Sequence, residues 1–167
     1  MSAADQTVQL FDRHRAALLR YLLSLRLAVP DAEEVVQEVF LALYEHLRNG
    51  KPQSNLRAWL FTVAHNLGLK RRARDQHLIA LVPLDTIDES PGPEELFADA
   101  QRQSRLQAIV RALPEQDQYV LALRAEGLPY REIAGILGIS PGSVANSLAR
   151  SVERLTRAGR RLYVTRG

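Results

Sequence analysis

LPYREIAGILGISPGSVANSLAR, residues 128–150, spells two short helices joined by a tight turn. Ala134 is a small residue on the inner face of the first helix, where a second helix has to cross closely. Gly138 follows as the end of that helix, because glycine adopts a positive φ without steric cost. Ser140 is placed to cap the second helix, and Pro141 takes its first position, where a missing N–H costs nothing. These residues together predict a helix-turn-helix.

The second helix of this motif has one face for packing and one for solvent. Val144 and Leu148 are four residues apart, so we expect them to fasten this helix to the first. The opposite face is expected to make major-groove contacts with DNA, where Asn146 is suited to bidentate pairing with adenine. The alternative is an ordinary helical hairpin whose glycine only caps a helix. The residues expected on the outer face are Ser143, Asn146, Ser147 and Arg150.

Composition limits the classes of protein and site that fit this chain. The 167 residues include no Cys, which excludes disulfides and thiolate metal sites, and the four His lack ligand spacing, so they are expected at surfaces or helix flanks. We therefore expect no metal and no cofactor. No catalytic cluster or phosphate-binding glycine loop is recognisable, so an enzyme is not expected. Without a signal peptide or the roughly 18 to 20 apolar residues of a membrane span, the sequence predicts a cytoplasmic protein with no membrane insertion.

Charge divides the chain into three parts. The overall net charge of +3 is the balance of +3 in residues 1–75, −5 in residues 76–104 and +5 in residues 105–167. Two basic lobes around an acidic connector suit a protein with two nucleic-acid contacts and a tether that avoids them. Charge fluctuation on solvated helix surfaces is the alternative explanation.

Helical periodicity continues on both sides of the connector, and no segment alternates as strands do. Three helices are expected in the first lobe: one that Pro30 closes, one that Asp31 is placed to cap and that runs to about Leu47, and one that Ser54 or Asn55 caps and that buries Trp59. Four helices follow in the second lobe. We predict an all-α protein of two small helical domains, residues 1–80 and 96–167, joined by a flexible, acidic, Pro-rich linker, residues 81–95.

Several segments resemble one family in the same order. They are DAEEVVQEVFLALYEHL (31–47), NLRAWLFTVAHNL (55–67), the Pro-rich linker, and LPEQDQYVLALRAEGLPYREIAGILGISPGSV (113–144). Over nearly all of residues 8–158 the chain resembles the short bacterial sigma factors of the extracytoplasmic-function class. The resemblance implies a region 2 that binds RNA polymerase and the minus 10 promoter element, and a region 4 that binds the minus 35 element. It also implies promoter-directed transcription initiation, with core RNA polymerase (β′ clamp helices and β subunit), promoter DNA and an anti-sigma factor as partners.

The resemblance assigns roles to particular positions of this sequence. An acidic ridge on the second helix is expected to dock on the polymerase: Asp31, Glu34, Gln37 and Glu38. A polar loop and the basic third helix are expected to hold a flipped base and strand phosphates of the minus 10 element: Asn49, Lys51, Ser54, Asn55, Asn66, Lys70, Arg71, Arg72 and Arg74. The residues expected at the minus 35 element are Arg131, Ser143, Asn146, Ser147, Arg150 and Arg154.

The chain departs from the family pattern at four positions. Lys70 stands where many relatives have an acid, so their base preference does not transfer. Relatives commonly have cations where this chain has Gln118, Ala145 and Ser147, so we expect weaker, less salt-sensitive minus 35 binding. Two other functions stay open: a helix-turn-helix regulator that does not bind polymerase, and a sigma-mimicking adaptor that sequesters an anti-sigma factor.

Overall fold

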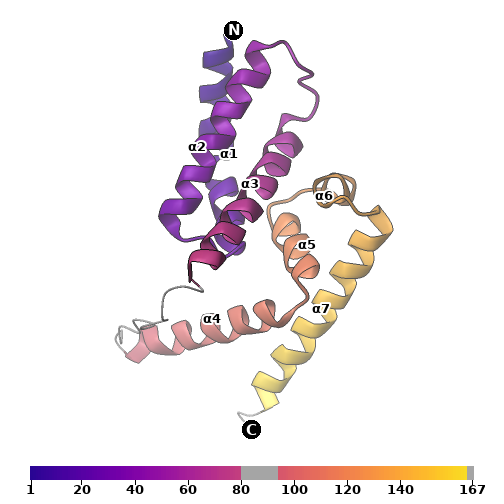
Figure 1. Cartoon of the computed structure of the whole chain (residues 1–167). Coiled ribbons are helices and arrows are strands. Elements are labelled where there is room, and N and C mark those ends of the chain that lie inside the picture. The colour runs from indigo at the N-terminus through magenta and orange to yellow at the C-terminus, as the bar shows by residue number, and fades with distance from the viewer. Residues whose placement is uncertain (80–93, 165–167) are drawn as a thin grey trace.

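The computed structural model describes residues 1–79 and 94–164, with side chains over 1–76 and 100–161, and every regular element in these ranges is an α-helix (Figure 1). This confirms the predicted all-α class. The helices are α1 (Ala3–Ser24), α2 (Val29–Arg48), α3 (Leu56–Ile79), α4 (Glu94–Ala112), α5 (Glu115–Ala125), α6 (Tyr130–Leu137) and α7 (Pro141–Val164).

Helices α1, α2 and α3 form the first lobe around an apolar core. Tyr21, Val39 and Phe61, one from each helix, are at most 1% exposed. A Cβ on Gly68 would lie 2.8 Å from a methyl group of Leu22, so the glycine allows α3 to cross α1 closely. The first lobe is thus a three-helix unit in which each helix buries one stripe.

Two predicted helix boundaries in this lobe are wrong. Pro30 does not close the first helix, because α1 already ends at Ser24 and Pro30 lies in the first turn of α2, where proline is tolerated. Asp31 does not cap α2, since the N-cap is Ala28 and Asp31 lies inside the first turn. A carboxylate there still interacts favourably with the positive end of the helix dipole. The predicted cap of the third helix is confirmed, because the Asn55 side chain accepts a hydrogen bond from the backbone N–H of Ala58 (3.3 Å).

Helices α4 to α7 form the second lobe and include the helix-turn-helix. Gly138 ends α6 with a φ of 68°, and Pro141 opens α7. The Ser140 hydroxyl accepts a hydrogen bond from the backbone N–H of Ser143 (3.0 Å), as an N-cap does. Val144 is fully buried against α6. The turn chemistry predicted from the sequence is therefore confirmed.

The connector is only partly described. Residues 81–93 of the predicted linker lie outside the described residues, so its flexibility and the two domain boundaries stay predictions. Glu94 and Glu95 were expected in the linker, but they form the first turn of α4. Within the described ranges, no helix has the length and apolar character needed to cross a membrane.

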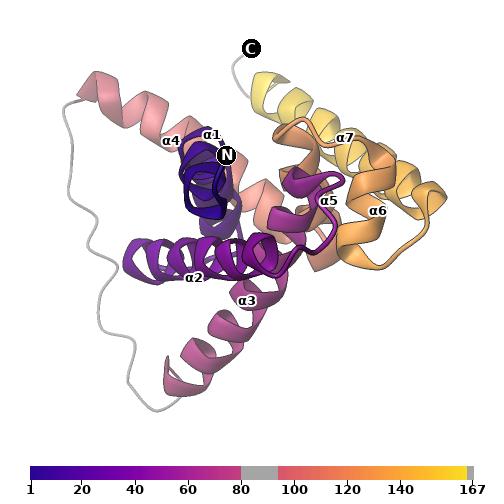
Figure 2. The same cartoon turned by 90° about the horizontal axis from the view of Figure 1, so that it is seen from above.

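The two lobes pack directly on each other. Helix α6 contacts α3, and α5 contacts α1, so the helix-turn-helix lies against the first lobe (Figures 1 and 2). Charge patterning predicted two lobes and a tether but not this contact. The junction places two candidate minus 10 residues of the first lobe, Asn55 and Arg72, against carboxylates of the second lobe, Glu132 and Glu115.

Candidate nucleic-acid interface

The exposed face of α7 keeps part of the predicted DNA-binding set. Asn146 and Arg150 are exposed and four residues apart, so they lie on one face of the helix. Arg131 on α6 and Arg154 on α7 are also exposed, whereas Ser143 is half-buried against the Ser140 cap. Amide and guanidinium donors are therefore presented together, as readout of base edges and phosphates requires.

Ser147 is not on this outer face, and its predicted exposure is wrong. It is fully buried, and its hydroxyl donates a hydrogen bond to Oδ1 of Asp117 (2.5 Å). Ser147 lies three residues after the buried Val144, and a spacing of three places a residue on the same helix face as well as a spacing of four does. Ser147 therefore faces the interior, as does Leu148, which the four-residue spacing had predicted to do so. A cation at this position would point into the lobe.

Asp117 lies beneath this surface and supports it, and it was not predicted from the sequence. Its side chain is 1% exposed, and Arg150 donates to the same Oδ1 at 3.1 Å. The other carboxylate oxygen is buried and lacks a hydrogen-bond partner within the described part of the chain. Because the side chain of Arg150 remains 54% exposed, one guanidinium nitrogen is anchored while the rest of the group faces solvent.

The basic end of α3 divides into exposed and paired cations. Asn66, Lys70 and Arg74 are exposed and follow one another at four-residue spacing, so they form one line along the helix. Arg71 instead lies 2.6 Å from Asp31 and 2.8 Å from Glu34, two of the carboxylates expected to bind polymerase. Two predicted sites are thereby joined in one ion cluster.

Gln37 and Glu38 complete the predicted ridge on α2, and both are exposed. Asp31 and Glu34 differ from them because Arg71 neutralises part of their charge. The ridge therefore has a paired end near the start of α2 and an open end one turn later.

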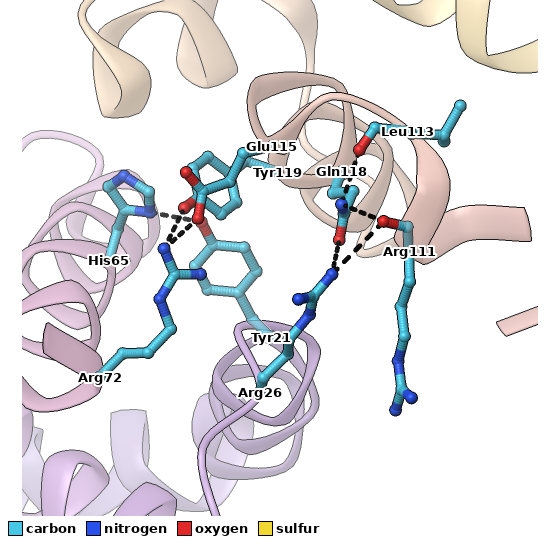
Figure 3. Close-up of polar contacts among 9 residues, drawn as sticks. All are labelled: Tyr21, Arg26, His65, Arg72, Arg111, Leu113, Glu115, Gln118 and Tyr119. Carbon is cyan, nitrogen blue, oxygen red and sulfur yellow. Dashed lines mark hydrogen bonds and ion pairs between the residues drawn. The ribbon is translucent and has the colours of Figure 1, made fainter. Parts of the chain in front are cut away.

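Arg72 crosses to the second lobe. It forms an ion pair with Glu115 and donates to the hydroxyl of Tyr119 (3.2 Å), and its side chain is 18% exposed (Figure 3). Hydrogen bonds from Tyr119 and Arg72 lower the pKa of Glu115 below its usual value. A second contact between the lobes lies beside it, where Arg26 of the first lobe donates to Oε1 of Gln118 (3.4 Å). The Gln118 amide in turn donates to the carbonyl of Leu113 (2.8 Å) within the second lobe rather than facing outward.

His65 lies beneath this junction and corrects the expectation that every His is a surface or helix-flank residue. It is buried, shares a 2.6 Å hydrogen bond with the Tyr21 hydroxyl, and packs edge-on against Tyr119. Burial, followed by the neighbouring charge of Arg72, lowers the pKa of His65, so the neutral ring is favoured. A neutral imidazole suits this apolar setting between the lobes.

The loop before α3 is polar and mostly exposed. Asn49, Lys51 and Ser54 are exposed, whereas Asn55 donates a 2.7 Å hydrogen bond to Glu132 of α6. Trp59 is half-buried against the core and packs at a tilt against the ring of His46, with ring centroids 4.6 Å apart. The tryptophan packs within the lobe and does not form a free stacking platform.

No group of His and acidic residues in the described ranges is arranged to hold a metal ion. The side chains on the surfaces described above can recognise a partner through hydrogen bonds and charge.

Comparisons with family models match both lobes. Residues 10–77 match the model described as Sigma-70 region 2, and residues 103–155 match the model described as Sigma-70, region 4. The chain is 32% identical over 160 residues to the ECF RNA polymerase sigma factor SigL of Mycobacterium tuberculosis, covering 94% of this chain and 90% of SigL. It is 36% identical over 131 residues to ECF RNA polymerase sigma factor ShbA of Streptomyces griseus, covering 74% and 67% of the two chains.

Solved structures share the fold. CnrH, solved in complex with the cytosolic domain of CnrY, gives a TM-score of 0.66 at 24% identity and covers 90% of this chain and 85% of CnrH. RpoE of Bartonella quintana, solved with the anti-sigma factor NepR, gives 0.63 at 22% identity and covers 91% and 97%. The helical architecture is therefore that of known sigma-factor structures.

Proposed function

Because the chain belongs to the sigma-70 family and is an alternative sigma factor of the extracytoplasmic-function class, we propose that its two lobes divide promoter recognition between them. The first lobe binds core RNA polymerase and the minus 10 element, and the second binds the minus 35 element. The protein acts in the cytoplasm, where polymerase works, and directs polymerase without catalysis of its own.

The observation that carries this proposal for the second lobe is the exposed pair Asn146 and Arg150 on one face of a capped helix. Asn146 pairs with a base edge, adenine being the base that its amide fits. Arg150 holds a phosphate through the donors that Asp117 leaves free. Because Ser147 is buried, its position supplies no cation to the DNA surface, and the affinity for the minus 35 element depends on few cations.

In the first lobe, the exposed side chains of Asn66, Lys70 and Arg74 contact one DNA strand along the minus 10 element. Gln37 and Glu38 at the open end of the ridge dock on polymerase, since Glu38 forms no ion pair within the described part of the chain, whereas Asp31 is paired with Arg71. An anti-sigma factor is a further partner, as RpoE of Bartonella quintana is solved with the anti-sigma factor NepR.

A salt titration of binding to matched and mismatched promoter duplexes tests the second-lobe assignment. Asn146→Ala should cost roughly 1 to 3 kcal/mol at one base position and relax preference there, whereas Arg150→Ala should weaken all duplexes equally and lower the salt slope by about one unit. Arg157→Ala is the matched control. Arg157 is an exposed cation about two turns after Arg150 on α7, and it is paired with Glu153. If Arg157→Ala and Arg150→Ala act alike, the recognition face is wrongly placed.

Core-enzyme affinity tests the first-lobe assignment. Glu38→Lys should weaken binding to core polymerase with native helicity, and Glu45→Lys, an exposed acid two turns along the same helix, should leave it unchanged. Equal affinities for both variants would place polymerase docking elsewhere.

A further inference from the structure

The loop between α2 and α3, residues 49–55, has a defined backbone at both ends. Gly50 and Asn55 have positive φ angles of 65° and 55°, a conformation that glycine and asparagine adopt more readily than other residues. The N–H of Lys51 donates to the carbonyl of His46 at 3.2 Å, which ties the start of the loop to the end of α2. The Asn55 side chain caps α3 at the other end. The loop is thus fixed where it leaves one helix and where it enters the next.

Two side chains from neighbouring helices hold the middle of this loop. Nε2 of His46, near the end of α2, lies 2.7 Å from the carbonyl oxygen of Pro52. Because a carbonyl oxygen can only accept, the imidazole N–H donates this hydrogen bond. The ring itself packs at a tilt against Trp59. Gln6 of α1 donates to Oε1 of Gln53 at 3.0 Å, since the loop lies at the end of the first lobe where α1 begins (Figure 1).

The His46 bond acts at the centre of the loop. Pro52 has no N–H, so its carbonyl is its only backbone hydrogen-bonding group. Lys51 and Ser54, candidate minus 10 contacts on either side of Pro52, are both exposed. The direction in which these side chains point therefore depends on a hydrogen bond from a helix whose position the core of the lobe determines.

We propose that His46 is a positioning residue for base recognition, which holds residues 49–55 in the shape that accepts an unstacked base of the minus 10 element. His46 acts through the loop and not by contact with the base. This inference rests on the proposed function of the first lobe, and it separates two properties of that lobe. Strand contacts from Lys70 and Arg74 on α3 give affinity for any sequence, whereas the fixed loop gives preference among bases.

The physical reason is the cost of ordering a loop when it binds. A loop that samples several conformations accepts a fitting base only in the competent fraction of molecules, so the apparent dissociation constant is the intrinsic constant divided by that fraction. A strand whose bases do not fit the loop loses nothing, because it does not use the loop. Loss of the His46 hydrogen bond should therefore lower the preference for the fitting base roughly fivefold and leave the affinity for other strands unchanged.

Substitutions at His46 separate its hydrogen bond from its ring packing. His46→Phe keeps a ring beside Trp59 and removes the donor, whereas His46→Gln loses the ring and keeps an N–H donor for Pro52. Amide hydrogen exchange of the free chain, measured at Lys51, reports how often the loop opens. We expect roughly fivefold faster exchange in His46→Phe and the native rate in His46→Gln. Equal exchange rates in all three chains would overturn the proposal.

Selection from a DNA library measures the base preference. Core polymerase saturated with each chain selects from short single-stranded DNA whose central positions are randomised. Enrichment of the preferred sequence over the library average should fall roughly fivefold with His46→Phe and match the native level with His46→Gln. Enrichment lost equally in both variants would overturn the role of the hydrogen bond. Faster exchange with unchanged enrichment would show that His46 holds the loop, and would instead overturn the loop's assignment to the minus 10 element.

Discussion

The buried pair of Asp117 and Ser147 gives the sharpest stability prediction. Ser147→Ala removes a hydrogen bond to a charged acceptor, an interaction worth about 1.5 to 3 kcal/mol, and leaves Oδ1 of Asp117 with Arg150 alone. We expect a loss of about 2 kcal/mol in the free energy of unfolding. Asp117→Ala should cost a similar amount or more, because it leaves the Ser147 hydroxyl buried without its acceptor. The double variant should fall short of the sum by about 1 to 2 kcal/mol, since the residues share one interaction.

Urea unfolding followed by far-UV circular dichroism measures these losses. The fluorescence of Trp59 reports on the first lobe, so a difference between the two signals identifies which lobe unfolds first. Thr156→Ala is the control, because Thr156 is exposed on α7 and its hydroxyl donates to the backbone carbonyl of Val152 in the same helix. Its cost should stay within about 0.5 kcal/mol. Additive effects of Asp117→Ala and Ser147→Ala would refute the reasoning.

Three further predictions follow from single positions. Gly68→Ala should cost about 1 to 3 kcal/mol in unfolding experiments because its Cβ would meet Leu22, whereas Gly135→Ala, with open space around it, should be stabilising by up to about 1 kcal/mol. Gly138→Ala should lower the melting temperature, since its φ of 68° costs other residues about 1 to 2 kcal/mol. His65, whose pKa is lowered in the folded chain, takes up a proton more readily when unfolded, so its contribution is present above about pH 6.5 and lost as the pH falls. His65→Gln should therefore reduce the difference in melting temperature between pH 7.5 and 5.5, and an unchanged difference would contradict this.

Local chemistry made the helix-turn-helix predictable from the sequence. Gly138, Ser140 and Pro141 act within one turn of their neighbours, and the structure has the predicted left-handed glycine, cap and first position. The error at Ser147 arose because inward direction was inferred from Val144 and Leu148 alone. Its partner Asp117 lies thirty residues away in sequence, so no local pattern contains the pair.

The long-range partners of the basic run were beyond sequence reasoning for the same reason. Arg71 and Arg72 are adjacent and identical in type, yet one binds carboxylates of its own lobe and the other binds Glu115 of the second. Neighbouring residues on a helix point about 100° apart, so packing of whole helices decides their partners. Composition predicted two basic lobes but carried no signal that they pack together.

Transcription from a randomised promoter library by purified core polymerase, with and without this chain, tests the central claim most directly. The account predicts chain-dependent transcripts that start at discrete sites, with two shared upstream sequence elements at a fixed spacing. Asn146→Ala should relax one position of the minus 35 element without moving the start sites. Transcripts identical with and without the chain, despite its binding to core polymerase, would contradict the account.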